Sequence, residues 1–415
     1  MFVQKIILSG VIVFFCSIVF GQKDNPDYLN TITTAVPFLL FECDQTANSI
    51  GGIGVVSSDD DISSGLLQNP SNLAGKRNSL GISFAEMQFG FYSIYKNIRS
   101  MRGYYSPGQK TSIGFNLKSI DLSKKNQTGS VANPIDFYTG LCLAYNLHHD
   151  FSIGIGAKYI YSDLIGKSGS QIHPDYKPAT SLAGDFGMNY RKTLPFNDNN
   201  ICRFHAGISV LNIGTKINYL KGSKSGDFLP AVLKVGIMLS YKRKFYEEKS
   251  YTINLAYQAE KLLVPTPPIL KLDSVGRPIP DENGYYEIEL GKNPDVGVFQ
   301  GIIQSFSDAP YGTWEEKNEI LHLFGLQQTV TSNKGIKYYL GCGYFHEHNT
   351  KGARRIATMG TGIQYGGVSI HAAAMLFLNL GQINGLYSRG IGLKLAYDIP
   401  LIYIKTKKKI VSSNE

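Results

Sequence analysis

Beyond residue 20, the sequence lacks any continuous apolar run of the roughly 18 residues that a membrane-spanning helix needs. A mean hydropathy of −0.10 is also too low for a helical membrane protein. Catalytic signatures are missing as well, because there is no Gly-x-Ser-x-Gly elbow and no other nucleophile–base motif. We therefore expect neither a helical membrane protein nor an enzyme, and no cofactor.

Cysteine is scarce and widely spaced. Five cysteines occur in 415 residues, and none belongs to a Cys-x-x-Cys pair. Cys16 lies in the N-terminal apolar run, while Cys43, Cys142, Cys202 and Cys342 stand far apart. This spacing is not typical of a disulfide framework or a zinc site, so we predict unpaired cysteines.

Three clusters of possible metal ligands have simpler interpretations. His346-Glu347-His348 places two imidazoles on one face of a strand, but a solvated strand end is the favoured reading. Asp59-Asp60-Asp61 lacks the spacing of an EF-hand loop and fits a solvated turn. His148-His149-Asp150 fits a tight turn between strands. We therefore predict no metal site.

The N-terminus has the layout of a secretory signal peptide. One cation, Lys5, precedes an apolar run over residues 6–20. We predict cleavage beside Gly21, which removes residues 1–21 and lowers the formal net charge from +9 to +8 (9 − 1, for Lys5). The alternative is an N-terminal membrane anchor, which the short apolar run disfavours.

Apolar and polar residues alternate along most of the remaining chain, as they do in β-strands. The apolar series are Ile113, Phe115, Leu117; Leu141, Leu143, Tyr145, Leu147; Phe151, Ile153, Ile155, Ala157, Tyr159, Tyr161; Val235, Ile237, Leu239, Tyr241; Ile253, Leu255, Tyr257; Leu340, Cys342, Tyr344; and Ile391, Leu393, Leu395, Tyr397. Between them stand glycines, amides and charged residues. A soluble sandwich and a membrane barrel both produce this pattern.

Three features favour an outer-membrane barrel. Tyrosines end several of the apolar series, as in the aromatic girdles of such barrels. Glycine crowds the alternate positions, for example Gly154, Gly156, Gly341 and Gly343, which suits a lumen that holds a plug. The strands are about ten residues long, enough for a tilted strand to cross a bilayer.

Short and long connections also alternate between the strands, of which we expect about 14 from Ser79 to Tyr397. The short ones are 106–110, 148–150, 331–335 and 365–367; the long ones are 122–135, 162–180, 213–230 and about 262–314. Outer-membrane barrels have short periplasmic turns and long outer loops. We therefore predict that the long connections lie outside the cell.

The sequence divides into four segments on this interpretation. After the signal peptide, residues 22–78 do not alternate, and their apolar "VPFLLF" needs burial. We predict that they form a plug, or hatch, inside the lumen of a barrel made by residues 79–400. Residues 401–415, which include "KTKKK", form a basic tail that we place in the periplasm.

Several irregular strings resemble the PorV-like proteins of type IX secretion, which belong to the wider FadL-like barrel family. They are "TAVPFLLF" with "QNPSNLA", "DFLP" (227–230), "KLLVPTPP" (261–268), "GVFQGIIQSFSDAPYG" (297–312) and "GYFHEHNTKGARR" (343–355). One position departs from the Asn-Pro-Ala hatch signature of the family, which is Asn69-Pro70-Ser71 here. The likeness covers about residues 33–366, and residues 367–415 share only the strand pattern.

The resemblance implies an all-β, 14-stranded antiparallel transmembrane barrel with an N-terminal plug in the outer membrane. It implies that the chain binds the C-terminal signal domain of secreted cargo leaving the type IX translocon and carries it to a sortase-like surface attachment complex. Other partners would be outer-membrane lipid and lipopolysaccharide, with no nucleic acid. The alternatives are a FadL-like transporter of hydrophobic small molecules and a passive porin.

Two sets of residues carry these expectations. Proline-stiffened loops suit a fixed docking surface, and loop cations either contact lipopolysaccharide phosphates or steer an acidic cargo end. The candidate cargo-binding residues are Pro265, Pro267, Phe306, Tyr311, Lys221, Lys224, Arg354 and Arg355. The candidate hatch residues are Pro37, Phe38, Asn69 and Pro70.

Overall fold

A computed structural model of the chain describes residues 29–57, 67–75, 78–91, 94–121, 124–125, 131–132, 134–166, 174–223, 226–245, 249–282, 285–378 and 389–401. The expected signal peptide, the acidic run 59–61, Lys224 and the basic tail from residue 402 lie outside the described residues. Within these ranges, no helix has the length and apolar character required to cross a membrane.

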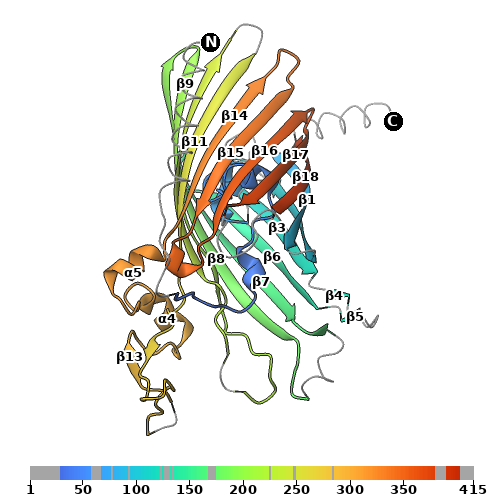
Figure 1. Cartoon of the computed structure of the whole chain (residues 1–415). Helices are drawn as coiled ribbons and strands as arrows, with labels where there is room; N and C mark the ends of the chain where they lie inside the picture. Colours follow the sequence, from blue (N-terminus) through green and yellow to red (C-terminus); the bar gives the residue numbers. More distant parts are fainter. Residues whose placement is uncertain are drawn as a thin grey trace.

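Fourteen antiparallel strands of the described chain close into a barrel, in which β1 pairs with β18 (Figure 1). The strands are β1 (Ser79–Phe91), β2 (Ile94–Ser106), β3 (Thr111–Asp121), β6 (Ile135–Asn146), β7 (Phe151–Asp163), β8 (Ala179–Asn197), β9 (Asn200–Gly214), β10 (Val232–Lys244), β11 (Ser250–Leu262), β14 (Leu321–Thr331), β15 (Lys337–His346), β16 (Arg355–Tyr365), β17 (Val368–Phe377) and β18 (Arg389–Pro400). The expected 14-stranded all-β barrel is confirmed.

Short helices and two strand pairs accompany the barrel strands. They are the helical turns η1 (Pro37–Leu40), α2 (Gln45–Asn48), η2 (Pro70–Gly75) and η4 (Asn349–Lys351), the helices α4 (Val298–Gln304) and α5 (Thr313–Asn318), and the strand pairs β4 (Lys124–Lys125) with β5 (Val131–Ala132) and β12 (Ile269–Leu270) with β13 (Ile288–Leu290). We call residues 263–320, between β11 and β14, the 263–320 module. It projects from one end of the barrel (Figure 1).

The connections separate by length, as expected. The four short connections predicted above lie at one end, together with the start of β1 and the end of β18. The long connections lie at the other end, which is the lower end in Figure 1. We call these the short-turn end and the long-connection end; which of them faces the cell exterior stays a prediction.

The outward face of the barrel is apolar and ends in tyrosines. Residues such as Ile155, Leu239 and Leu393 are each more than half exposed, because they point away from the lumen. Seven exposed tyrosines lie near the short-turn end: Tyr105, Tyr145, Tyr190, Tyr241, Tyr338, Tyr365 and Tyr397. They form the expected aromatic girdle at that end. Tyr344 departs from its series, since it is only 1% exposed.

The inward face carries the predicted glycines, and most of them touch the plug; Gly156 instead lies against Asp185 of β8. A Cβ on Gly343 would collide with the backbone of Gly51, and one on Gly154 would collide with the backbone of Pro70 and Ser71. Further inward glycines against the plug are Gly187, Gly207, Gly236, Gly325, Gly341, Gly360 and Gly392. Without side chains at these positions, the plug lies directly on the barrel wall, as the glycine pattern predicted.

Candidate functional site

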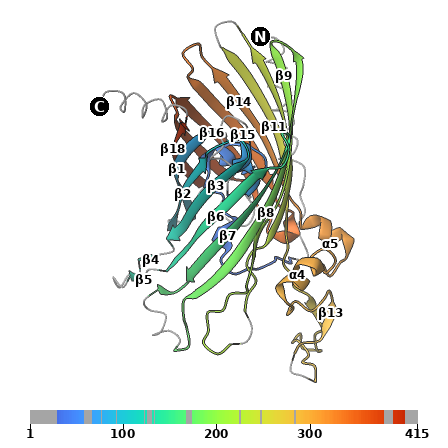
Figure 2. The ribbon, with the colours of Figure 1, turned by 180° about the vertical axis from the view of Figure 1, so that it is seen from behind.

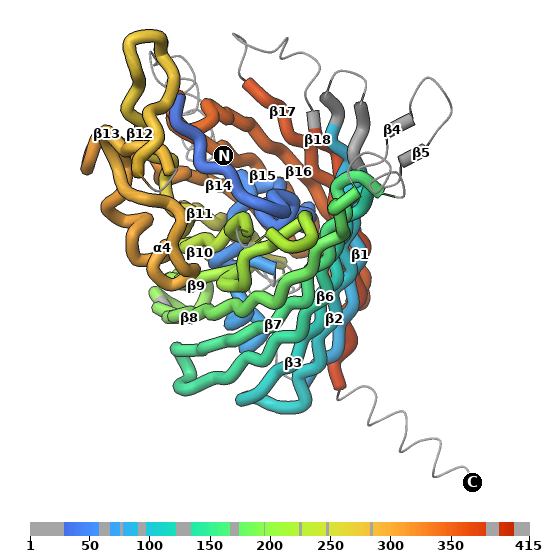
Figure 3. The backbone as a smooth tube through the Cα atoms, turned by 90° about the horizontal axis from the view of Figure 1, so that it is seen from below, coloured from blue at the N-terminus to red at the C-terminus, as the bar shows by residue number. Residues whose placement is uncertain are grey.

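The plug, defined as residues 36–57 and 67–75, crosses the lumen along the barrel axis (Figure 3). At the long-connection end, Ala35 N donates to Phe228 O at 2.9 Å. Near the short-turn end, Asn146 Nδ2 donates to Ala74 O at 2.8 Å. The chain therefore enters from the long-connection end and reaches β1 at the opposite end.

Asp44 is the electrostatic centre of the plug. Its carboxylate is fully buried and pairs with Arg102 on β2 and with Lys394 on β18, the latter at 3.2 Å. It also caps α2 by accepting a hydrogen bond from Thr46 N at 2.8 Å. Both cations are essentially unexposed, at 1% and 0%. A buried carboxylate with two cations and a helix cap fixes the plug to two strands of the wall.

A second set of wall residues holds the plug through amides. On β11, Gln258 accepts from Gly54 N and Val55 N at 3.0 and 2.9 Å. Lys234 on β10 pairs with Glu260 at 2.8 Å and donates to Gln68 of the plug at 3.2 Å. The plug is thus fixed from opposite sides of the barrel.

The four expected hatch residues all lie in the plug. Asn69 is fully buried, and its Nδ2 donates to Val55 O at 2.9 Å while its Oδ1 accepts from Ser71 N at 3.0 Å. Phe38 is 2% exposed and packs 6.2 Å from the ring of Tyr138. Pro70 is buried and begins η2, whereas Pro37 is exposed.

A cavity of about 290 Å³ lies beside the plug. Its apolar lining includes Phe89, Ile98, Ile120, Ile356, Met375 and Phe377. Polar groups line part of it, among them Glu42, Lys234, Glu260 and Arg354. This shape and lining fit a small amphipathic molecule.

The 263–320 module is fixed to the barrel by a buried ion network. Lys351 Nζ lies 2.6 Å from Glu315 and 2.9 Å from Glu319, and both carboxylates are 1% exposed. Lys261, the penultimate residue of β11, pairs with Glu316 at 3.0 Å and also with Glu319. These contacts join α5 to two points on the barrel rim.

The N-terminal segment joins the same network. Asn30 Nδ2 donates to Glu315 at 3.0 Å and to Pro267 O at 3.1 Å, and Asn30 N donates to Thr350 O at 2.9 Å. One set of polar contacts therefore connects the barrel rim, the module and the chain that leads into the plug.

The module presents large apolar side chains to solvent. Phe299 and Ile303 are one helical turn apart on α4 and are 74% and 75% exposed. Phe306, Tyr311 and Trp314 are each about half exposed. We call these five residues the aromatic face. Aromatic side chains exposed on an element that is anchored to the rest of the protein are typical of binding surfaces.

The described cargo-binding candidates other than the two arginines fall into three places. Phe306 and Tyr311 belong to the aromatic face. Pro265 is buried and packs against Gly301 of α4, and Pro267 is half-buried, so both position the module rather than present a surface. Lys221 is exposed on the neighbouring long connection.

The two arginines lie at the barrel rim. Arg354 forms a two-point ion pair with Glu347, at 2.7 and 2.8 Å, and lines the lumen cavity. Arg355 donates to Asn349 at 2.8 Å. Each arginine has a polar partner close by, and a role for either in binding cargo stays a prediction.

The sequence analysis did not identify two features of the long-connection end: part of the aromatic face and the buried ion network. Phe299 and Ile303 could have been found from their i, i+4 spacing in "VFQGIIQ", and Trp314 from being the one tryptophan of the chain. The network of Lys351 with Glu315 and Glu319 has no sequence signal, since its members are more than 30 residues apart.

Asp308 is expected to make the stability of the module depend on pH. Burial raises the pKa of this carboxyl to about 6, and only Oδ2 has a hydrogen-bond partner in the described chain, Thr266 N at 3.1 Å. Because the pKa is raised on folding, the protonated form stabilises the module below about pH 4, and this stability is lost as pH rises to about 6.

We therefore expect Asp308→Asn to stabilise the module by on the order of 1–3 kcal/mol at about pH 7 and to have little effect near pH 4. Protease resistance of the module in the folded barrel, measured at both pH values, checks this. Equal effects at the two pH values would contradict it.

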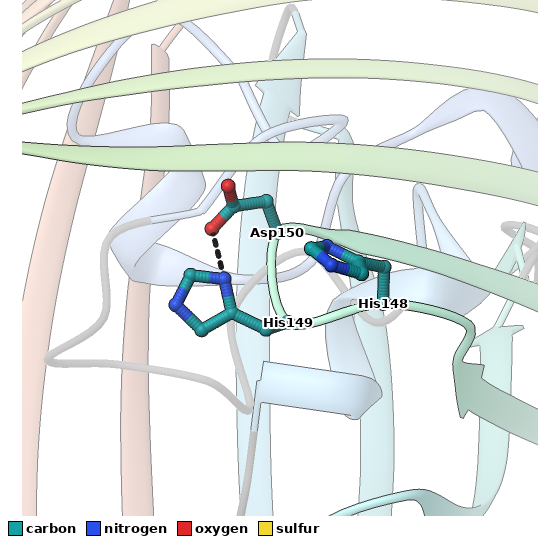
Figure 4. A group of neighbouring side chains, drawn as sticks. All are labelled: His148, His149 and Asp150. Atoms are coloured by element: carbon teal, nitrogen blue, oxygen red, sulfur yellow. Dashed lines mark ion pairs between the residues drawn. The ribbon is translucent and has the colours of Figure 1, made fainter.

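The histidine cluster at 148–150 forms the turn expected of it, whereas residues 346–348 are not the expected solvated strand end, because Glu347 is only 5% exposed. His148 and Phe151 exchange backbone hydrogen bonds at 3.1 and 3.2 Å, which makes the predicted tight turn. Asp150 of this turn pairs with His149 at 2.6 Å (Figure 4). It also pairs with Lys192 at 2.8 Å. Elsewhere, His348 caps η4 by accepting from Thr350 N at 3.3 Å. The absence of a metal site stays a prediction.

Comparison with known proteins identifies the family. A family model described as type IX secretion system protein PorV matches residues 23–269, more than half of the chain. Among solved structures, the Ralstonia pickettii toluene transporter TbuX shares 9% identity over 86% of this chain and 97% of its own, with a TM-score of 0.39. A Pseudomonas aeruginosa FadL homologue shares 10% over 90% and 99%, with a TM-score of 0.40.

These structural likenesses concern the fold alone, and no curated protein matches the sequence. The family match includes the plug and the barrel as far as β12. The chain belongs to the PorV family of outer-membrane components of the type IX secretion system.

Proposed function

We propose that this protein binds the C-terminal signal domain of secreted cargo leaving the type IX translocon and carries it to the cell-surface attachment complex. The observation that carries the proposal is the aromatic face of the 263–320 module. Family membership supports a role in type IX secretion, and this face supplies a surface on which a folded domain can dock.

Physical reasons favour this face over the lysine-rich loops. Binding energy concentrates in a few large aromatic or apolar contacts, whereas rim charges mainly change the rate of encounter. The support is also preorganised, because Lys261 and Lys351 hold α5 through buried carboxylates. A surface that is already ordered loses less entropy on binding.

The test separates the aromatic face from the rest of the module. Replacing Phe299, Ile303 and Phe306 by serine keeps every ion pair of the buried network, removes the Phe306 ring that lies 5.9 Å from Lys261 Nζ, and should abolish co-purification of secreted cargo, which should then be retained in the periplasm. The matched control replaces Leu272 and Val275, which are also more than half exposed but lie near the β12–β13 hairpin. Cargo reaching the surface at wild-type levels in the triple variant would overturn the proposal.

A broader variant replaces the connection 262–312 with a Gly-Ser linker. The barrel is expected to assemble, because β11 and β14 pair directly along their lengths, and cargo delivery is expected to fail. Normal delivery by an assembled, linker-bearing barrel would also overturn the proposal.

The lumen cavity favours a second candidate, transport of hydrophobic small molecules across the outer membrane. Its apolar lining and its position beside the plug support this alternative. Filling the cavity by Ile120→Trp with Met375→Trp should then stop uptake of a labelled fatty acid and leave cargo secretion intact. Unchanged uptake would remove this candidate.

A further inference from the structure

Charged side chains of two neighbouring hairpins line one cavity at the short-turn end of the barrel. The cavity has a volume of about 410 Å³ and lies between the tips of the β8–β9 and β10–β11 hairpins. Its lining residues include Asn197, Asp198, Asn199, Arg243, Lys244 and Phe245. The tip of the β8–β9 hairpin is at the end of the barrel opposite α4 and α5 (Figure 2). The cavity is therefore separate from the aromatic face and from the lumen cavity.

Hydrogen bonds hold the two hairpin tips together and preform the cavity. Lys244 N donates to Asn199 O at 2.7 Å, which joins the end of β10 to the turn after β8. The Tyr241 hydroxyl donates to Asn200 Oδ1 at 2.7 Å. Asn197 Oδ1 closes the β8–β9 turn by accepting from Asn199 N at 3.1 Å and from Asn200 N at 2.8 Å. A ligand that binds here does not have to order these backbones first.

The charged groups of the cavity have no partner in the described part of the chain. The side chains of Arg243, Lys244 and Asp198 form no hydrogen bond or ion pair with any described residue. The Arg243 guanidinium lies over the ring of Phe245, 5.2 Å from its centroid, which orients the guanidinium and leaves its N–H donors unused. Two cations and one carboxylate are therefore available to a ligand.

Arg243 lies at the level of the lipid head groups. It is two positions beyond Tyr241 of the aromatic girdle on β10 (243 − 241), on the same outward side. At about 3.3 Å per residue and a strand tilt of about 40°, this places it about 5 Å further from the bilayer centre. Girdle tyrosines sit at the head-group level, so the cavity faces the phosphates of the adjacent leaflet.

Apolar side chains flank these cations. Phe196, beside Asn197 at the end of β8, is 74% exposed, and Leu194 and Phe245 are each about half exposed. Leu194 and Phe196 share the outward side of β8 with Tyr190 of the girdle. A surface that combines aromatic, aliphatic and cationic side chains at this depth fits a lipid better than a soluble ion.

We propose that this cavity binds the head group of a glycerophospholipid of the phosphoethanolamine class. The lipid phosphate accepts hydrogen bonds from Arg243 and Lys244, and the ammonium group donates to Asp198. Arginine binds phosphate oxygens through two parallel N–H donors, and such charge-assisted bonds are stronger than neutral ones. The acyl chains then extend along Phe245 and the apolar wall below the girdle. The proposal concerns neither cargo nor transport, so its outcome is independent of the proposed function.

Native mass spectrometry of the purified barrel tests the proposal. Wild-type protein is exchanged into micelles that contain equal amounts of dioleoyl phosphatidylethanolamine and dioleoyl phosphatidylglycerol. We expect one phosphatidylethanolamine to be retained per chain, with about threefold less phosphatidylglycerol, because the ammonium group adds one exposed ion pair with Asp198. Equal retention of the two lipids, or retention of neither, would overturn the proposal.

The double variant Arg243→Ala/Lys244→Ala tests the two cations. Its retention of phosphatidylethanolamine is expected to fall about tenfold or more, since each cation near a membrane surface contributes to phosphate binding. The matched control is Lys110→Ala/Lys334→Ala, which removes two exposed lysines from other turns at the same end and should retain the lipid. Undiminished retention in Arg243→Ala/Lys244→Ala would contradict the assignment.

Two further measurements separate the lipid head group from a free anion. Asp198→Asn is expected to remove the preference for phosphatidylethanolamine over phosphatidylglycerol, and a preference that survives would overturn the role of the ammonium group. Inorganic phosphate in excess over lipid is expected to leave the retained phosphatidylethanolamine unchanged. Displacement of the lipid would assign the cavity to free phosphate and would also overturn the proposal.

Discussion

Asp44→Ala is expected to free the plug from the barrel wall and to make the barrel conduct ions. The substitution leaves Arg102 and Lys394 buried and uncompensated, which costs about 3–5 kcal/mol. It also removes the cap of α2, worth about 1 kcal/mol. Single-channel conductance in planar bilayers, together with labelling of a cysteine placed at Ser49 in the plug, measures the release.

Two further variants make this prediction specific. Asp44→Asn keeps an acceptor for Thr46 N but no charge, and we expect an intermediate conductance. Combining Asp44→Ala with Arg102→Met and Lys394→Met removes the stranded charges and should restore part of the block. Wild-type conductance in Asp44→Ala would show that the amide contacts of Gln258 hold the plug without help.

Lys351→Ala is expected to detach the 263–320 module from the rim. The loss leaves the buried carboxylate of Glu315 without a cation and Glu319 with Lys261 alone, at a cost of about 3–5 kcal/mol, whereas the barrel strands keep all their backbone pairs. The module should become protease-sensitive in an intact barrel, and cargo recovery should fall with it.

The control for this variant is Lys334→Ala, which removes an exposed lysine from a turn at the other end of the barrel. A second variant, Lys351→Met with Glu315→Gln, removes one of the stranded charges and is expected to recover part of the protease resistance. Full resistance in Lys351→Ala alone would mean that Lys261 suffices to hold α5.

The barrel could be predicted from the sequence because its signal is local. A strand repeats every two residues, so the positions of Leu239 or Lys158 along their own strands decide which of them meets the lumen. The glycine positions carried information of the same kind, since a wall that must touch a plug cannot hold side chains there. The lengths of the connections then predicted which of them share one end of the barrel.

The contacts that anchor the plug and the module join residues far apart in the sequence, and this is why they could not be predicted. Asp44 meets Lys394 across 350 positions, and Asn30 meets Glu315 across 285. A period of two cannot reveal such pairs. It also failed at Tyr344, which belongs to an outward series but is buried in the structure. The five residues of the aromatic face became recognisable only once their exposure was known.

The seam between β1 and β18 has a consequence for biogenesis. The last strand supplies both the partner that closes the cylinder and Lys394, one of the two cations on Asp44. Contacts this distant form slowly, because loop-closure entropy must be overcome before they form. A polypeptide cut short before residue 389 would keep an unpaired edge on β1, which is a template for aggregation, and would lack one of the two cations that pair with Asp44 of the plug. Closure of the barrel and full neutralisation of Asp44 therefore both depend on residues 389–400.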